Sequence, residues 1–139
     1  MSNDITFSII KPDALGAGKA AKILCRIADA GFTLSALKML HMTRAQAEGF
    51  YAVHRDRPFY PGLVEFMSSG PVIVMVLKHE DAVEEFRRLI GTTDPAKAAP
   101  GTIRADFGTD VRTNAVHGSD SPENAIREAS FFFSNIEMF

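Results

Sequence analysis

The residues best suited to chemistry lie in the run NAVHGSDS at positions 114–121. In this run His117 follows a short apolar segment and precedes the start of a predicted helix. An imidazole has an unperturbed pKa of about 6.5, so at pH 7 it is mostly neutral and one ring nitrogen carries a free lone pair. Because the N-terminus of a helix attracts anions, a histidine that faces it is suited to act as a nucleophile toward phosphorus.

The neighbours of His117 allow both this chemistry and a plainer interpretation. A nucleophilic imidazole needs a carbonyl or carboxylate on its other ring nitrogen to fix the tautomer. Gly118 would let backbone approach closely, and the hydroxyls of Ser119 and Ser121 can cap helix amides or orient the ring. The pattern alone favours the plainer interpretation, a polar residue at a strand end beside ordinary capping serines.

A polyphosphate site also needs positive charge, and three basic residues occur at suitable positions. Lys11 follows a predicted strand, Arg87 lies at the edge of the apolar arc of a predicted helix, and Arg104 lies in a long loop. Each of them alone is more simply explained as a solvated charge. Phe59, at a proline-rich helix junction, fits a contact with the core as well as it fits a platform for stacking a base.

The chain has one cysteine and four histidines, and their spacing argues against a zinc site. His41, His54 and His79 show no close metal-ligand spacing with His117 or Cys25, so we expect packing or surface roles for these three. Cys25 lies in an apolar helical pattern, which predicts a buried thiol and no internal disulfide.

A P-loop is excluded as well, although residues 16–19 resemble the end of one. The pattern GxxxxGK[ST] requires a glycine at position 13 and a hydroxyl at position 20. The chain has Asp13 and Ala20 there. Any phosphate site must therefore be built in another way.

Composition predicts a single domain over residues 1–139 that does not bind nucleic acid or membranes through charge. Fifteen basic and seventeen acidic side chains give a formal net charge of −2. The longest apolar run, at residues 72–77, is far shorter than the roughly 20 residues that span a bilayer. The first residues lack the basic region of a signal peptide, so we expect a cytoplasmic location.

Apolar and β-branched residues predict four strands, over residues 5–10, 32–42, 72–77 and 111–116. The first strand ends at Lys11-Pro12-Asp13, which predicts a turn. The third is apolar on both faces, as is typical of a strand in the middle of a sheet.

Apolar residues at helical spacing and capping residues predict the helices between these strands. The helices are expected over residues 20–30 and 61–68, from the capping box of Thr43 and Gln46 to before Pro58, from Asp81 to Gly91, and from Ser121 onward. This order predicts an α/β (α+β) fold, a ferredoxin-like split βαβ with a four-stranded antiparallel sheet and a helical pair inserted at residues 43–68. Residues 91–108 form a long loop with little periodicity, which is typical of a functional segment.

Five segments together resemble one family over nearly the whole chain. They are SIIKPD at residues 8–13, YAVHRDRPFY at 51–60, SGPVIVMVL at 69–77, PGTIRADF at 100–107 and NAVHGSDSPENA at 114–125. In this combination the chain resembles nucleoside diphosphate kinases of the bacterial, short-chain type. The resemblance implies a split βαβ fold and a ping-pong reaction, in which the γ-phosphoryl group of a nucleoside triphosphate passes to His117 and then to a nucleoside diphosphate, maintaining nucleotide pools.

The resemblance also implies a nucleotide site and a cofactor. Lys11 and Asn114 would contact the sugar hydroxyls, Lys11 would also approach the transferred phosphate, and Phe59 would stack on the base. The polyphosphate would be held by Arg87, Thr93 and Arg104. Mg²⁺ would bridge the phosphates and would be held mainly by them, with no metal site made by the protein alone.

Around the nucleophile, the resemblance implies that Glu128 orients His117, that Ser119 supports Glu128, and that Tyr51 lies beside the ring. It further implies a homo-oligomer. The chain after the Phe131-Phe132-Phe133 run is brief, which favours a homotetramer or a dimer over a hexamer with contacts made by the tail.

Two other classes of protein are compatible with the predicted fold. A split βαβ sheet is also the scaffold of the RRM nucleic-acid-binding module, but residues 72–77 offer no aromatic ring for base stacking and the net charge is slightly acidic. A structural oligomer that has lost activity is the second class, and the intact set of Lys11, Arg87, Arg104 and His117 argues against it.

Overall fold

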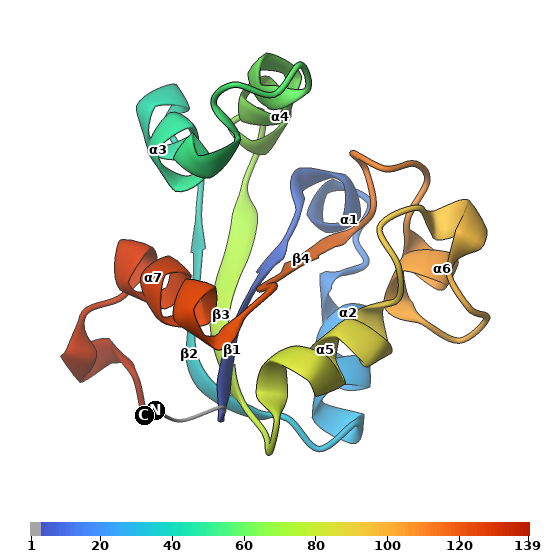
Figure 1. Ribbon diagram of the computed structural model, residues 1–139. Coiled ribbons are helices and arrows are strands. Elements are labelled where there is room, and N and C mark those ends of the chain that lie inside the picture. The colour runs from blue at the N-terminus through green and yellow to red at the C-terminus, as the bar shows by residue number, and fades with distance from the viewer. Residues whose placement is uncertain (1–3) are drawn as a thin grey trace.

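Four antiparallel strands form one sheet in the order β2-β3-β1-β4 (Figure 1). The computed structural model describes residues 4–139 of the chain. The strands are β1 (Ile5–Ile10), β2 (Thr33–Leu40), β3 (Val72–Lys78) and β4 (Val116–Gly118). The predicted ferredoxin-like α+β fold is thus confirmed, with β3 and β1 in the centre of the sheet.

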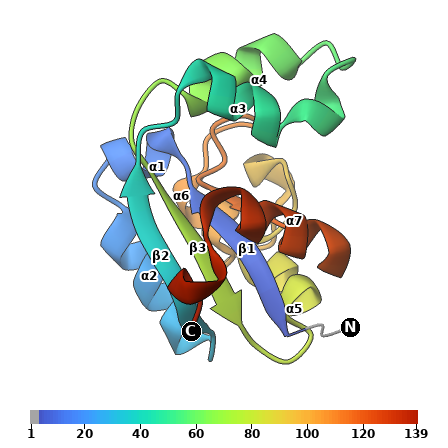
Figure 2. The ribbon, with the colours of Figure 1, turned by 90° about the vertical axis from the view of Figure 1, so that its left-hand side faces the viewer.

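Helices cover both faces of this sheet (Figure 2). The α-helices are α1 (Pro12–Gly16), α2 (Ala20–Asp29), α3 (Arg44–Phe50), α4 (Tyr60–Met67), α5 (Ala82–Ile90), α6 (Ile103–Phe107) and α7 (Pro122–Phe132), and short 3₁₀ helices are η1 (Ala52–His54), η2 (Pro95–Lys97) and η3 (Asn135–Glu137). The inserted pair α3 and α4 stands together at one end of the sheet (Figure 1). None of the helices within residues 4–139 is long and apolar enough to cross a membrane.

The central strand β3 explains why both faces are covered. Its even-numbered residues from 72 to 76 pack in one apolar cluster with α3, α4 and α7, and its odd-numbered residues from 73 to 77 pack in a second with α1, α2, α5 and α6. Alternate side chains of a strand point to opposite faces, so a strand that is apolar throughout needs both faces covered. The sheet consequently has no open face for stacking bases, which counts against the RRM alternative.

Most of the predicted helix ends are confirmed. The capping box of Thr43 and Gln46 is present at α3, and the Ser121 hydroxyl accepts a hydrogen bond from the Asn124 amide at 3.1 Å at the start of α7. Asp81 is the exception, because it adopts a left-handed conformation with φ of 49°. Within the described chain its carboxylate makes no capping hydrogen bond, so the predicted cap of α5 is wrong.

Two predictions for the ends of β1 and β4 are wrong. Residues 12–16 form α1 and are not a simple turn: Pro12 keeps Lys11 extended, but proline fits the first turn of a helix. Residues 111–115 are not part of a strand. The carboxylate of Asp110 accepts hydrogen bonds from the backbone amides of Arg112 and Thr113, which form a turn in place of a ladder.

Cys25 is exposed on α2, which corrects the prediction of a buried thiol. The buried residues of this helix are Ile23 and Ile27, four positions apart on one face. Cys25 lies midway between them in sequence, and residues two apart in a helix face different directions. The apolar residues near Cys25 in the sequence therefore do not bury its side chain in the folded chain.

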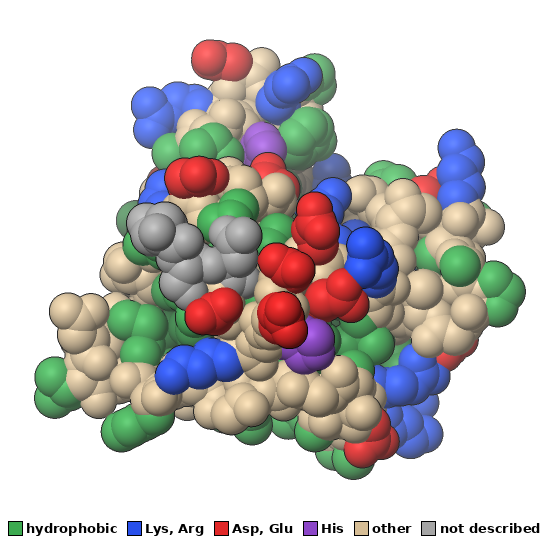
Figure 3. All heavy atoms as spheres, turned by 60° about the horizontal axis from the view of Figure 1, so that its bottom comes forward, with side chains coloured by type: hydrophobic (Ala, Val, Ile, Leu, Met, Phe, Trp, Pro, Cys, Tyr) green, Lys and Arg blue, Asp and Glu red, His purple; other side chains and the backbone are tan. Residues whose placement is uncertain are grey.

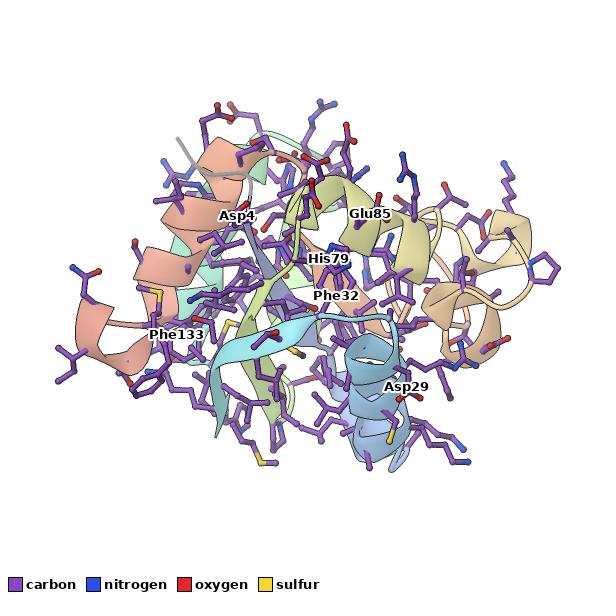
Figure 4. All side chains as sticks on the ribbon, turned by 90° about the horizontal axis from the view of Figure 1, so that it is seen from below. Asp4, Asp29, Phe32, His79, Glu85 and Phe133 are labelled. Carbon is purple, nitrogen blue, oxygen red and sulfur yellow. The ribbon has the colours of Figure 1, made fainter. Side chains whose placement is uncertain are left out.

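At the end of the sheet where β3 leads into α5, the surface is acidic and a histidine packs against an aromatic ring. Acidic side chains gather on this face (Figure 3), and Glu80, Asp81, Glu84 and Glu85 belong to the turn and the first residues of α5. The ring of His79 packs against that of Phe32, with 4.5 Å between the ring centroids and 32° between the ring planes (Figure 4). This contact confirms the packing role expected for His79.

Two glycines with nearly the same positive φ allow a test of packing at the end of α5. Gly91 has φ of +89° and Gly101 has φ of +90°. A Cβ on Gly91 would lie 2.7 Å from the hydroxyl of Thr102, whereas a Cβ on Gly101 would meet no atom of residues 4–139 within 4 Å. We expect Gly101→Ala to lower the free energy of unfolding by about 1 kcal/mol through backbone strain alone, and Gly91→Ala to lower it by about 2–4 kcal/mol.

Denaturant unfolding curves of the two variants measure this difference. An equal loss of stability in both would show that the contact with Thr102 contributes nothing.

Candidate active site

A cleft of about 1240 Å³ lies between α4 with the segment that leads into it, the loops around α6, and the first half of α7. It brings together residues that are far apart in the sequence. Nine of the ten predicted site residues line it: Lys11, Tyr51, Phe59, Arg87, Thr93, Arg104, Asn114, His117 and Glu128. The tenth, Ser119, is buried behind Glu128.

His117 is held by a hydrogen bond between its Nε2 atom and the Oε1 atom of Glu128, at 3.0 Å. The side chain lies in the middle of β4 and is 18% exposed. Since an ionised carboxylate only accepts hydrogen bonds, Nε2 carries the proton and Nδ1 keeps its lone pair. The rings of Phe7, Phe50 and Tyr51 surround the imidazole edge-on, with centroid distances of 5.6–6.4 Å, and limit its rotation.

Glu128 is itself fixed by its neighbours. Ser119 donates a hydrogen bond from its hydroxyl to the same Oε1 atom at 2.7 Å. Burial of Glu128 opposes ionisation, but hydrogen bonds from His117 and Ser119 and the charge of Arg127 outweigh it, so the pKa of the carboxyl lies below its usual value. Glu128 belongs to the buried face of α7, three residues after the buried Ala125.

Lys11 is buried at the end of β1 and donates from Nζ to Oδ1 of Asn114 at 2.7 Å. Burial and the nearby Arg104 lower the pKa of Lys11 to about 8, partly opposed by Asp13. Asn114 in turn donates from Nδ2 to the carbonyl oxygen of Thr93 at 3.0 Å. This network joins β1 to the long loop that precedes α6.

Arg104 extends from α6 into the cleft. Its Nη1 atom donates to the carbonyl of Gly91 at 3.1 Å and its Nη2 atom donates to the carbonyl of Val116 at 2.9 Å. Burial and the charge of Arg87 lower the pKa of Arg104 to about 10. The Nε atom is buried and has no hydrogen-bond partner within residues 4–139. Buried cations with carbonyl partners and free donors form a site that an anion would stabilise.

Tyr51 and Phe59 present two further groups to the cleft. The Tyr51 hydroxyl is buried without a hydrogen-bond partner in the described chain. Its burial and the negative charge of Glu128 raise the pKa of Tyr51 well above its usual range, so it stays a neutral donor. Phe59 is 46% exposed, and its ring lies 5.3 Å from that of His54, so one aromatic face can be offered to a ligand.

Two residues that shape the site were not found from the sequence. Ala115 has φ of +75°, an uncommon left-handed conformation for a residue with a Cβ, and it lies between Asn114 and Val116. Its amide donates to Oδ2 of Asp13 at 3.1 Å, and its carbonyl accepts from the Lys11 amide at 2.9 Å. An alanine gives no signal of such a turn, and the partner Asp13 is more than a hundred residues away in sequence.

Comparisons with known proteins identify the family. A model of the family described as nucleoside diphosphate kinase matches residues 4–138. The nucleoside diphosphate kinase of Salinibacter ruber is 52% identical over 138 residues, covering 99% of this chain and 97% of the relative. That of Desulfotalea psychrophila is 56% identical over 133 residues, covering 96% and 97%.

Solved structures agree with this result. The nucleoside diphosphate kinase of Aquifex aeolicus superposes with a TM-score of 0.96 at 51% identity, covering 98% of this chain and 99% of that one. A halophilic nucleoside diphosphate kinase from Halobacterium salinarum in complex with CDP superposes with a TM-score of 0.93 at 39% identity, covering 98% and 91%. The chain belongs to the nucleoside diphosphate kinase family.

Proposed function

We propose that His117 carries the phosphoryl group in the nucleoside diphosphate kinase reaction of this chain. The supporting observation is the hydrogen bond between Nε2 of His117 and Glu128, which leaves Nδ1 as the free nucleophile in a cleft lined by cations. The enzyme is a phosphotransferase, and both half-reactions take place at this one nitrogen.

In the first half-reaction the lone pair of Nδ1 attacks the γ-phosphorus of a nucleoside triphosphate. The new N–P bond forms as the bond from phosphorus to the bridging oxygen breaks, and its electron pair leaves with the nucleoside diphosphate. Positive charge develops on the imidazole and is stabilised by Glu128. In the second half-reaction a terminal oxygen of another diphosphate attacks the same phosphorus, and the N–P electron pair returns to Nδ1.

We assign the other residues of the cleft by their chemistry. The phosphates would be held by Lys11, Arg87, Thr93 and Arg104, with the sugar near Lys11 and Asn114, the base on Phe59, and the hydroxyl of Tyr51 beside the histidine. Phosphoryl transfer depends mainly on positioning and on stabilising charge, which fixed cations around a fixed nucleophile provide.

Mg²⁺ is the proposed cofactor, held mainly by the nucleotide. Across the described part of the chain, no group of three or more His, Cys, Asp or Glu residues is arranged to hold a metal ion. A donor set of lysine and arginine suits phosphates and does not coordinate a hard cation. Mg²⁺ would neutralise part of the negative charge of the phosphates. Nucleoside diphosphates and triphosphates are cytoplasmic metabolites. We therefore propose that the protein is located in the cytoplasm.

We also propose that the protein forms a homo-oligomer, a tetramer or a dimer. The edge strand β2 exposes Leu34, Leu37 and Met39, which a second chain could cover. The last residues lie along this strand within their own chain, since the Phe139 amide donates to the carbonyl of Ser35 at 2.8 Å. Light scattering measures the mass of the protein in solution. A mass equal to that of one chain would contradict this proposal.

Labelling with γ-³²P-ATP tests the role of His117. Wild type is expected to acquire acid-labile, base-stable phosphate and to lose it when GDP is added, because an N–P bond has this stability and is reversible. His117→Gln is expected to acquire none. His79→Gln, which changes the histidine packed against Phe32 outside the cleft, is the control and should label like wild type. Full labelling of His117→Gln would overturn the assignment.

The lowered pKa of Lys11 predicts a pH dependence. Below about pH 8 the ammonium form predominates and attracts phosphates, and above it the charge is lost. We therefore expect kcat/KM to fall by up to about tenfold per pH unit above pH 8, since this parameter reports groups of the free enzyme. The guanidinium of the Lys11→Arg variant stays charged above pH 8. Whatever activity this variant retains, its kcat/KM should therefore not fall in that range.

Lys22→Arg, on the exposed surface of α2, is the matched control and should keep the wild-type pH profile. A wild-type profile that stays level to pH 9.5 would show that the charge of Lys11 is not needed.

A further inference from the structure

Arg112 reaches across the mouth of the cleft from the loop that precedes β4. It lines the cleft together with Phe59 and Gly62 of the opposite wall. A Cβ on Gly62 would lie 2.5 Å from Nη2 of Arg112, 2.8 Å from Cζ and 2.9 Å from Nη1. The flat guanidinium therefore lies directly against the backbone of α4.

The backbone of Gly62 does not itself require a glycine. Gly62 lies in the first turn of α4, and its φ is outside the left-handed region that disfavours other residues. Alanine is the better helix former. What the glycine provides at this position is room for the guanidinium of Arg112.

The loop that carries Arg112 is also fixed. Oδ1 of Asp110 accepts hydrogen bonds from the amide of Arg112 at 2.9 Å, and from the amide and hydroxyl of Thr113 at 2.8 and 2.9 Å. The next residue, Asn114, is tied to Lys11. The backbone of Arg112 is consequently held on both sides, and its side chain leaves the loop from a defined position.

The guanidinium and the exposed ring of Phe59 line the same cleft. Gly62 follows Phe59 by three residues at the start of α4, and residues three apart on a helix are neighbours on one face. The N–H groups of the guanidinium have no acceptor among residues 4–139. A base stacked on Phe59 would therefore present its edge to a set of free donors.

We propose that Arg112 is a specificity-determining residue that donates hydrogen bonds to the base and favours 6-oxopurines over adenine. The proposal rests on the proposed nucleotide site, with the base on Phe59. Guanine and hypoxanthine offer two neighbouring acceptors, O6 and N7, which match the paired donors of a guanidinium. Adenine replaces O6 with an amino group that is itself a donor, so one of the two hydrogen bonds cannot form.

The test measures how fast different diphosphates discharge the phosphorylated enzyme. Enzyme labelled with γ-³²P-ATP and freed of nucleotide is mixed with limiting GDP, IDP or ADP, and the second-order rate constant is followed by quenched flow. We expect GDP and IDP to react about five- to tenfold faster than ADP. IDP lacks the 2-amino group of GDP, so equal rates for these two assign the preference to O6 and N7.

Two variants should remove the preference by different routes. Arg112→Ala deletes the donors, and Gly62→Ala keeps them but displaces the guanidinium. In each we expect the GDP-to-ADP ratio to fall to near one with little change in the rate for ADP, and the double variant should show no further change. Arg57→Ala, an exposed arginine outside the cleft, is the control and should keep the wild-type ratio.

Phe59→Ala separates stacking from reading of the base edge. Stacking stabilises any base, and its loss should slow discharge by all three diphosphates about 5- to 150-fold. Circular dichroism and thermal unfolding establish that each variant is folded.

An unchanged GDP-to-ADP ratio in Arg112→Ala or in Gly62→Ala would overturn the proposal, as would IDP that reacts like ADP. If no diphosphate discharges the wild-type enzyme, or if no phosphoenzyme forms, the proposed function itself fails. Discharge by all diphosphates at rates independent of the base would leave that function intact and refute this inference alone.

Discussion

The site depends on the hydrogen bond between Nε2 of His117 and the carboxylate of Glu128. It joins β4 to α7, fixes the tautomer of the imidazole, and decides which nitrogen faces the cleft. Ser119 holds the carboxylate from behind, and the cap at Ser121 sets where α7 begins, so the position of Glu128 follows from the start of its helix. The imidazole is therefore oriented before any nucleotide enters, which is the form of preorganisation that phosphoryl transfer needs.

Two of the cations around this histidine are largely buried, which costs free energy that a bound phosphate would offset. Lys11 and Arg104 are withdrawn from water, and their partners are an amide and backbone carbonyls. The pKa of each side chain is consequently lowered, which means that the folded chain holds these cations less favourably than water does. Polyphosphate would restore the missing counter-charge, and the same cations would then stabilise negative charge in the transition state. The left-handed Ala115 holds the loop before β4 against the end of β1, through its hydrogen bonds with Asp13 and with the Lys11 amide.

The sequence predicted the four-stranded antiparallel sheet, the central place of β3 and most helices because local signals specify them: the two-sided apolar β3, the capping box at Thr43, and the serine before α7. It failed where one local pattern allows two structures, as for the strand expected at residues 111–116 and the face of α2 that carries Cys25. The basic residues Lys11, Arg87 and Arg104 are far apart in the sequence, and no local pattern shows that they line one cleft. Glu128 was identified only through the family, because a glutamate within an amphipathic helix gives no sign of a partner on a neighbouring strand.

The contact with Glu128 leaves Nδ1 of His117 as the nitrogen that can accept the phosphoryl group. Phosphorus and nitrogen NMR of the phosphorylated enzyme, prepared with ¹⁵N-labelled histidine, measures which ring nitrogen is bonded to phosphorus through the one-bond coupling. We expect coupling to Nδ1, with Nε2 still protonated. Coupling to Nε2 would contradict it, because that nitrogen could not carry phosphorus while it donates to the carboxylate.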